Sequence, residues 1–127
     1  MRLLLDTHVL LWWLADHPAL PQVMRAVLAD PSTQALVSAA TAWEIAIKRA
    51  LGRLDFPVDE LDIILKDNGF KPLPITTAHA VAAGALPRLH ADPFDRMLVA
   101  QARCESLTLA SVDPMVARYG VTVLNGA

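Results

Sequence analysis

The chain has 127 residues, of which 54% are hydrophobic and 19% charged, and its formal net charge is −2 at pH 7. This length is typical of one domain, and the high apolar fraction excludes an intrinsically disordered chain. The single cysteine excludes a disulfide scaffold and a zinc site built from thiolates. With 11 basic and 13 acidic residues the chain has no general basic surface for nucleic acid, so such binding would depend on a local patch or a metal.

The apolar segments are too short to cross a membrane. The longest unbroken run covers residues 9–15, whereas a spanning helix needs about 20 residues. Asp6 interrupts the apolar stretch where the core of a signal peptide would lie. We therefore expect no membrane span, no signal peptide and a cytoplasmic location.

The apolar pattern predicts short strands that alternate with helices. In the first half of the chain we expect strands over residues 2–5 and 35–38 and helices over residues 9–15, 21–29 and 41–51. In the second half we expect helices over residues 58–66, 77–85, 93–105 and 114–119 and strands over residues 108–111 and 121–124. Residues 71–75 contain two prolines and form at most a connector or an edge strand. Short, wholly apolar strands between helices predict an α/β fold with a parallel sheet covered on both faces.

The helix predicted over residues 41–51 has several large apolar side chains. We expect Trp43, Ile45, Ile47 and Leu51 to supply its apolar area.

Acidic residues occur at the predicted ends of the strands and the starts of the helices. Asp6 directly follows the first strand, and Glu44 falls in the first turn of the helix after the second strand. Asp92 and Asp95 begin the longest helix, and Asp113 follows the strand at 108–111. Because the carboxyl ends of parallel strands meet at one edge of a sheet, where ligands bind, we expect these acids to lie close together.

Helix capping explains each of these acids taken singly. Asp6 or Thr7 fits an N-cap for the first helix, and Glu44 fits a capping box that begins three residues earlier. Asp92 and Asp113 each precede a proline, the pattern of an N-cap followed by proline at the first helical position. Capping does not explain why so many acids converge on one edge of a small sheet.

Clustered carboxylates repel one another and raise one another's pKa unless a cation neutralises them. Hard oxygen ligands at a partly hydrated site suit Mg²⁺ or Mn²⁺. Such an ion lowers the pKa of a bound water and holds a phosphodiester for in-line attack. Since the chain has no obvious protein nucleophile, the acids suggest metal-dependent hydrolysis of a phosphodiester.

Four segments of the chain resemble the acidic blocks of the PIN-domain ribonucleases, and in particular the VapC-like toxins of bacterial toxin–antitoxin pairs. These segments are residues 3–8 (LLLDTH), 43–45 (WEI), 92–102 (DPFDRMLVAQA) and 109–113 (LASVD). The resemblance implies a single PIN domain over residues 1–127, with a three-layer α/β/α fold around a small central parallel sheet. It also implies an Mg²⁺- or Mn²⁺-dependent endoribonuclease, an RNA substrate, a cognate antitoxin that inhibits the enzyme, and commonly a homodimer.

The resemblance also suggests the functional residues. By position, the catalytic and metal-binding acids are Asp6, Glu44, Asp95 and Asp113. Asp92 is a second candidate ligand beside Asp95, which we favour because its place one turn into the helix lets it point outward near the positive end of the helix dipole. Thr7 and Ser111 match hydroxyl positions near the family's site and are candidates for holding a water or a phosphate.

Two basic residues are candidate substrate contacts, and each has a structural alternative. Arg96 adjoins Asp95, where it would meet an RNA phosphate or form a salt bridge. Lys48 lies one turn beyond Glu44, where it would contact the RNA backbone or pair with that acid.

The histidines and tryptophans have mainly structural interpretations. The four histidines lack metal-ligand spacing, so we interpret them as capping or surface residues, with only His8 near the site. Trp12 and Trp13 point about 100° apart on a helix. We expect one of them in the core and the other at a dimer or antitoxin interface.

Other classes of function remain as alternatives. A receiver-type phosphoacceptor domain needs a lysine late in the chain, but none follows Lys71. A phosphatase with an aspartyl nucleophile needs the pattern D-x-D, whereas Asp6 is followed by Thr7 and His8. A catalytically idle PIN domain that binds RNA or protein is disfavoured because all four acids are present, and a nuclease that acts on DNA stays open.

Overall fold

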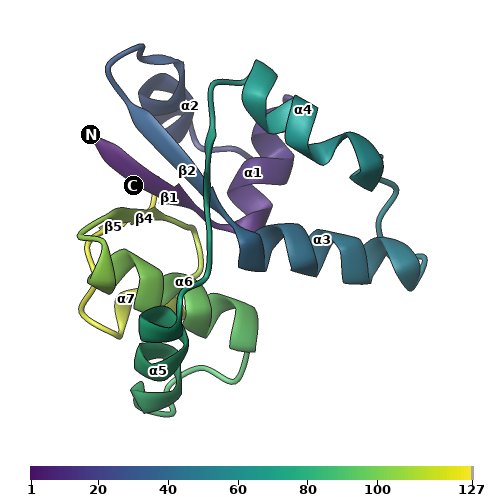
Figure 1. Ribbon diagram of the computed structural model, residues 1–127. Coiled ribbons are helices and arrows are strands. Elements are labelled where there is room, and N and C mark those ends of the chain that lie inside the picture. Colours follow the sequence, from purple (N-terminus) through teal and green to yellow (C-terminus); the bar gives the residue numbers. More distant parts are fainter. Residues whose placement is uncertain (127) are drawn as a thin grey trace.

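A five-stranded, all-parallel β-sheet forms the centre of the chain, as the computed structural model shows for residues 1–126 (Figure 1). Its strands are β1 (Arg2–Leu5), β2 (Gln34–Ser38), β3 (Lys71–Leu73), β4 (Thr108–Ala110) and β5 (Val123–Leu124). They are ordered β3-β2-β1-β4-β5. The prediction of an α/β fold with a parallel sheet is confirmed, while residue 127, the last of the predicted domain, lies outside the described residues.

Helices cover both faces of this sheet. One face carries α1 (Thr7–Leu14), α2 (Gln22–Ala29) and α4 (Leu61–Asp67), which a short 3-10 turn at Val58–Glu60 precedes. The other face carries α5 (Thr77–Ala85), α6 (Pro93–Cys104) and α7 (Pro114–Ala117). Helix α3 (Ala39–Ala50) extends from the carboxyl end of β2 (Figure 1). The result is the expected three-layer α/β/α arrangement, and none of the described helices has the length and apolar character that a membrane span requires.

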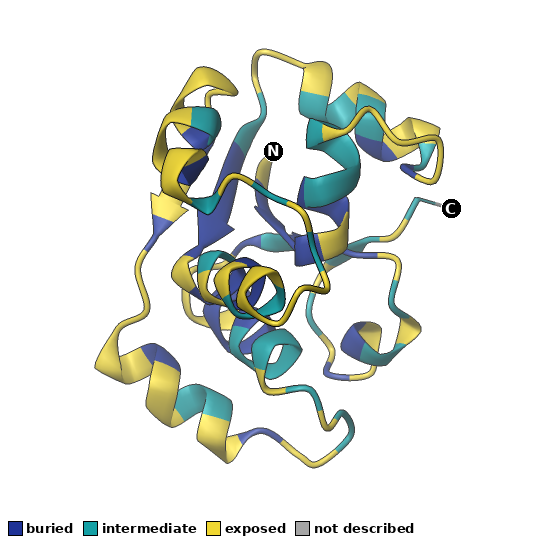
Figure 2. Cartoon of the chain, turned by 90° about the vertical axis from the view of Figure 1, so that its right-hand side faces the viewer, coloured by how far each residue is buried: buried dark blue, intermediate teal, exposed yellow. Residues whose placement is uncertain are grey.

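The core is divided by the alternation of side chains along the strands. In β1, Leu3 and Leu5 point into the cluster beneath α1, α2 and α4, whereas Leu4 points into the cluster beneath α5, α6 and α7. In β2, Val37 and Leu36 divide in the same way. Both faces of the central strands are therefore buried (Figure 2), which is why the middle positions of these strands, residues 3–5 and 35–37, are all apolar.

Side-chain caps determine where two helices begin, and both begin earlier than predicted. Asp6 accepts a hydrogen bond from the backbone N–H of Val9, so α1 begins at Thr7. Ser38 accepts one from Ala40, so α3 begins at Ala39. The expected capping box ending at Glu44 is therefore wrong, because Glu44 lies in the second turn of α3.

The expected distribution of large apolar side chains is only partly right. Ile45 is fully buried, but Trp43 is 63% exposed and Leu51 is 61% exposed, because α3 extends away from the sheet. Neither Trp12 nor Trp13 lies fully in the core, since both are partly buried against the cluster beneath α1, α2 and α4. The segment at residues 71–75 does supply an edge strand, β3, as expected.

A buried glutamine joins the sheet to two helices. Gln101 of α6 has no exposed surface, and its side-chain carbonyl accepts a hydrogen bond of 2.5 Å from the Ser38 hydroxyl. Its amide nitrogen donates to the carbonyl of Pro74 and lies 3.3 Å from Nδ1 of His79. Within the described residues, each buried side-chain polar atom has a hydrogen-bond partner.

We predict that Gln101→Leu lowers the free energy of unfolding by about 1–3 kcal/mol, because the buried Ser38 hydroxyl loses its acceptor. Urea unfolding at neutral pH measures the change. The control is Arg103→Leu, an exposed position on the same helix, for which we expect a change within about 0.5 kcal/mol. Equal unfolding midpoints for Gln101→Leu and the parent chain would contradict the role of this amide.

Candidate metal centre

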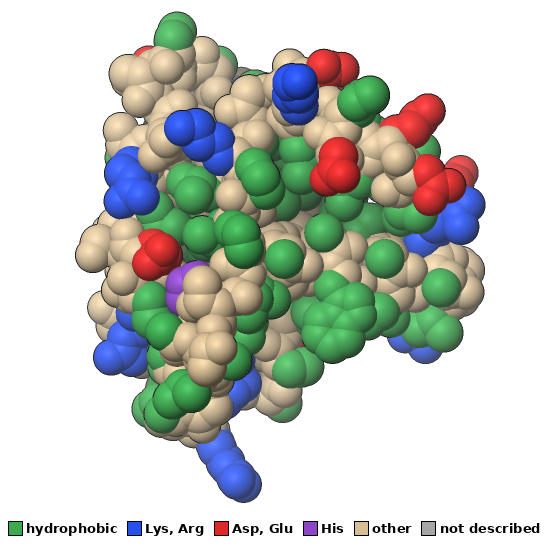
Figure 3. Space-filling model, viewed as in Figure 1, with side chains coloured by type: hydrophobic (Ala, Val, Ile, Leu, Met, Phe, Trp, Pro, Cys, Tyr) green, Lys and Arg blue, Asp and Glu red, His purple; other side chains and the backbone are tan. Residues whose placement is uncertain are grey.

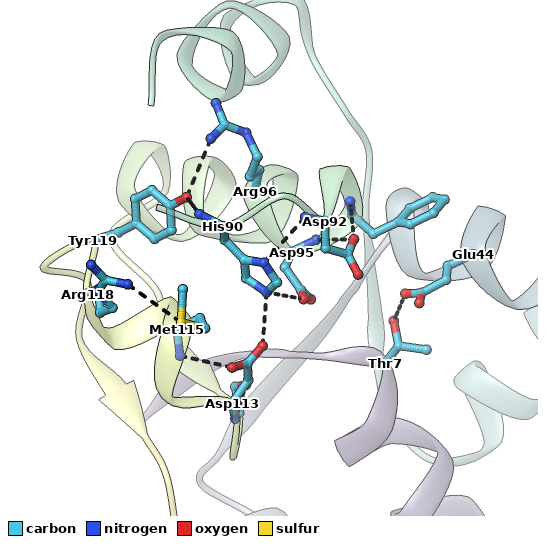
Figure 4. Close-up of polar contacts among 12 residues, drawn as sticks. Thr7, Glu44, His90, Asp92, Asp95, Arg96, Asp113, Met115, Arg118 and Tyr119 are labelled. Carbon is cyan, nitrogen blue, oxygen red and sulfur yellow. Dashed lines mark hydrogen bonds and ion pairs between the residues drawn. The ribbon is translucent and has the colours of Figure 1, made fainter. Parts of the chain in front are cut away.

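Three side chains from separate segments meet beyond the carboxyl end of the sheet. His90 lies in the loop before α6, Asp95 in the first turn of α6, and Asp113 directly before α7. The Nε2 atom of His90 lies 3.0 Å from Oδ2 of Asp95 and 3.0 Å from Oδ2 of Asp113 (Figure 4). Each of the three residues offers one ligand atom, and these atoms all lie within 4.8 Å of one another.

Asp6 completes the acidic cluster, which we define as Asp6, Asp95 and Asp113. Asp6 is only 5% exposed, and its carboxylate caps α1 and is hydrogen-bonded by the side chain of Ser111. The cluster lines a cavity of about 300 Å³ together with His8, Trp12 and Val112. Asp6 and Ser111 come together because β1 and β4 pair in parallel, with Leu5 opposite Ala110.

The cluster carries more negative charge than its surroundings neutralise. Burial, followed by the charges of Asp92 and Asp6, raises the pKa of Asp95 from 3.8 to about 6, while His90 acts in the opposite direction. Burial also raises the pKa of Asp6, although hydrogen bonds from Ser111 and Val9 oppose this shift. A bound cation would relieve this repulsion.

The donor set fits a hard divalent cation. Nδ1 of His90 accepts a hydrogen bond from the backbone N–H of Asp92, so in the neutral ring Nε2 carries the proton and donates to the two carboxylates. In this arrangement the available ligand atoms are carboxylate oxygens, which suit Mg²⁺ or Mn²⁺. The acidic cluster would hold the ion, with His90 orienting Asp95 and Asp113.

The two acids at the start of α6 differ in what they contact. One oxygen of Asp92 accepts hydrogen bonds from the backbone N–H groups of Phe94 and Asp95, at 2.8 and 3.3 Å, so Asp92 is the N-cap of the helix. Asp95 instead faces His90, as Figure 4 shows. This geometry favours Asp95 over Asp92 as the ligand.

Glu44 lies at the margin of the centre. It is buried, accepts a hydrogen bond of 2.6 Å from the Thr7 hydroxyl and pairs with the ammonium group of Lys48 at 2.8 Å. Within the described residues it makes no hydrogen bond or ion pair with the acidic cluster, and its link to Asp6 runs through the neighbouring Thr7. Lys48 thus forms the ion pair with Glu44 that was the structural alternative to a contact with the RNA backbone.

Arg96 does not form the salt bridge that its neighbour Asp95 suggested. Its guanidinium donates to the carbonyl oxygens of Ala83, Leu86 and Pro87, where α5 ends. It also lies 3.4 Å from the hydroxyl of Tyr119, which accepts a hydrogen bond of 2.8 Å from the backbone N–H of His90. Arg96 therefore holds the loop that carries His90 and does not face the cavity.

The hydroxyl of Ser111 is also fully engaged. Its oxygen accepts a hydrogen bond of 3.1 Å from the backbone N–H of Asp113, and its side chain bonds Asp6. Ser111 thus fixes two members of the acidic cluster relative to each other.

Sequence reasoning missed His90. The interpretation of the histidines as capping or surface residues, with only His8 near the site, is wrong for His90. A single histidine has no ligand spacing to detect, and its partner Asp113 lies 23 residues further along the chain. The available signal was its place two residues before the acidic block at residues 92–102.

We predict that Asp95→Asn raises the melting temperature at pH 7 in the presence of a chelator. Because the pKa of Asp95 is about 6 in the folded chain and 3.8 ordinarily, the folded state holds this proton more tightly. The stabilisation of the fold by this bound proton is complete below about pH 4 and is lost as the pH rises through 6. The gain from Asp95→Asn should therefore grow between pH 4 and pH 7.

Thermal unfolding across this pH range measures the effect. Asp62→Asn, on an exposed carboxyl of α4, is the control and should give no such trend. A lower melting temperature for Asp95→Asn at pH 7 would show that the ionised carboxylate stabilises the fold.

Comparison with known proteins identifies the family. The model of the PIN domain matches residues 3–121. A search of curated protein sequences found no match. Solved structures share the fold across nearly the whole chain, at sequence identities that by themselves show only the fold.

Three of these structures come from bacterial complexes. VapBC2 from Rickettsia felis, bound to a DNA fragment from its promoter, aligns with a TM-score of 0.72 at 15% identity and covers 98% of each chain. FitAcB from Neisseria gonorrhoeae gives 0.66 at 22%, covering 98% of this chain and 97% of the other. A toxin–antitoxin complex from Klebsiella pneumoniae gives 0.65 at 18%, with the same coverage. The acidic cluster thus lies in a chain that belongs to the PIN domain family.

Proposed function

We propose that this chain is a VapC-like toxin, an Mg²⁺- or Mn²⁺-dependent endoribonuclease, with residues 1–127 acting as one PIN domain. The observation that carries the proposal is the acidic cluster, in which burial, together with the charges of Asp92 and Asp6, raises the pKa of Asp95 to about 6 at the wall of a cavity. A site of this kind, in a PIN domain, fits hydrolysis of a phosphodiester.

The residues divide into those that hold the ion and those that position the ligands. Asp6, Asp95 and Asp113 would bind the ion through their oxygens. When bound, the ion activates water and neutralises charge on the phosphodiester. Thr7 orients Glu44, and we keep Glu44 as a catalytic acid that acts from the margin of the centre on the attacking water.

The substrate contacts follow from the same geometry. Thr7 and Ser111 bond site acids directly, so we propose that they position those acids and waters around the phosphate. Lys48 stays a candidate phosphate contact because its side chain is 38% exposed despite its ion pair with Glu44. Arg96 is no longer a candidate, since its hydrogen bonds are made to backbone carbonyls and to Tyr119.

A catalytically idle PIN domain that binds RNA or protein is the second candidate function. Such a domain would have no need of three neighbouring carboxylates without a cation to neutralise them, because their mutual repulsion lowers stability. The acidic cluster therefore favours the nuclease. We also propose a cytoplasmic location for this activity.

We further propose that an antitoxin inhibits the enzyme, as the toxin–antitoxin complex among the similar structures suggests. A groove of about 660 Å³ lies between α1, α2 and α4, and its apolar lining includes Trp13, Leu14, Phe56 and Ile64. An apolar antitoxin helix would occupy this groove. An arginine or lysine beyond that helix would pair with the acidic cluster. We also expect the toxin to be a homodimer, which sedimentation equilibrium would test.

We predict that the purified chain cleaves single-stranded or structured RNA with Mg²⁺ or Mn²⁺ and that EDTA abolishes cleavage. Asp6→Asn and Asp95→Asn should each abolish activity and also the rise in melting temperature on adding Mn²⁺, since ligand binding stabilises only a chain that binds it. Asp92→Asn is the matched control and should keep most of the activity.

Cleavage that persists in EDTA would overturn the metal mechanism. An active Asp95→Asn with an inactive Asp92→Asn would show that the two acids have been assigned the wrong way round. A melting temperature that Mn²⁺ leaves unchanged would argue for the idle domain.

We predict that Trp13→Ala weakens antitoxin binding more than Trp12→Ala does. Trp13 lines the groove and donates a hydrogen bond to Asn68, whereas Trp12 lines the metal cavity and stacks on His17. Loss of an aromatic anchor costs about 2 kcal/mol or more in binding. Titration calorimetry with the cognate antitoxin at a temperature where both variants are folded measures this. If neither variant loses affinity, the antitoxin binds elsewhere.

A further inference from the structure

A pair of aromatic rings, one of them exposed, lies at the margin of the candidate metal centre, where its residues directly precede Glu44 and Asp95. The rings of Trp43 on α3 and Phe94 on α6 meet edge to face, with centroids 5.4 Å apart and planes at 74°. Trp43 is 63% exposed, and of the Trp, Tyr and Phe side chains of the described residues it is the only one classed as exposed. Figure 3 shows hydrophobic side chains gathered on the face of the molecule along α3. An exposed indole at such a position needs an explanation, because burying it in the core would have been favourable.

The pair is fixed in position relative to the acids. Trp43 directly precedes Glu44, and Phe94 directly precedes Asp95. The backbone N–H of Phe94 donates to the Asp92 cap, which fixes the start of α6. On the other side, Glu44 is tied to α1 through the Thr7 hydroxyl. The same helical turns therefore display the acids and the two rings.

Few positively charged side chains near the cavity are available to bind an RNA backbone. None of the described residues that line it is a lysine or an arginine. Lys48 is paired with Glu44, and the guanidinium of Arg96 is bonded to carbonyls. Of the basic side chains considered above, Lys48 is thus the one candidate for neutralising a phosphate, so side-chain charge alone would bind RNA weakly here. Stacking of a base on an aromatic ring needs no cation and accepts any base.

We propose that Trp43, supported by Phe94, is a stacking platform for one base of the single-stranded RNA that enters the metal centre. This inference rests on the proposed function and adds a substrate-positioning residue to it. An edge-to-face contact covers at most one face of one of the two rings, so the indole keeps a face for a base.

A second copy of the chain is the competing occupant of these rings. A stable interface buries about 800 Å² on each partner, whereas a fully covered aromatic side chain supplies about 150–250 Å². Two rings, one of them already partly buried, match the size of a planar base, whereas a second copy would also have to cover the neighbouring apolar side chains of this face (Figure 3).

The test measures binding of a fluorescent single-stranded RNA by anisotropy in an Asp95→Asn background, which prevents cleavage. We expect Trp43→Ala to weaken binding between about 5- and 150-fold, the range for loss of one stacked base. Trp43→Phe should retain most of the affinity because it keeps a ring. The matched control is Leu51→Ala, which removes a side chain of similar exposure at the far end of α3 and should bind as the parent does.

A series of RNAs with one abasic ribose at successive positions makes the test specific. At the stacking position, removal of the base should weaken binding to the parent and leave binding to Trp43→Ala unchanged. Equal affinity of Trp43→Ala and the parent would overturn the platform. So would a Trp43→Ala loss that is the same at every abasic position.

The oligomeric state and the activity separate the remaining outcomes. The oligomeric state of the parent and of Trp43→Ala is measured by sedimentation without RNA. A dimer that Trp43→Ala dissociates would assign the rings to a second copy and overturn the inference. Metal-dependent RNA cleavage by the chain with Asp95 intact is measured first. Its absence overturns the proposed function itself, whereas cleavage combined with unchanged RNA affinity of Trp43→Ala overturns only the platform.

Discussion

The parallel pairing of β1 with β4 is the constraint on which the site depends. Leu5 lies opposite Ala110, and the backbone N–H of Asp6 donates to the carbonyl of Ala110. The next residues of both strands, Asp6 and Ser111, therefore emerge side by side. The chain then turns into a helix after each strand, which brings Asp113 to the same edge. A different register would move these side chains apart and separate the acids.

Asp6 and Asp113 each have two electrostatic roles, as helix caps and as members of the acidic cluster. Asp6 and Asp113 cap the helices that follow them, so the N–H groups at each helix start stabilise the charge. Asp113 caps α7 with one oxygen and faces His90 with the other. Capping therefore does not compete with ligation but orients the carboxylate for it. Asp95 has no capping role, and its pKa is the one raised to about 6.

The remainder of the site depends on supports that lie outside the acidic blocks. Arg96 holds the end of α5 and the hydroxyl of Tyr119, which in turn holds the backbone of His90. His90 then bridges Asp95 and Asp113. Arg96, which the sequence suggested as a phosphate contact, thus supports the geometry of the centre through Tyr119 and His90.

The sequence by itself determined the alternation of strands and helices, the α/β class and the position of Asp6, Asp92, Asp95 and Asp113 at helix starts. These features depend on local periodicity and on capping, which are readable in short segments. Only the tertiary structure decided that His90 joins the acids, that Glu44 stays at the margin beside Thr7 and Lys48, and that Trp43 is exposed. Those outcomes depend on how α3, α6 and the loop before α6 pack against β1 and β4, and such contacts join residues far apart along the chain. Periodicity along a helix shows which face is apolar, but only packing shows whether another element covers that face.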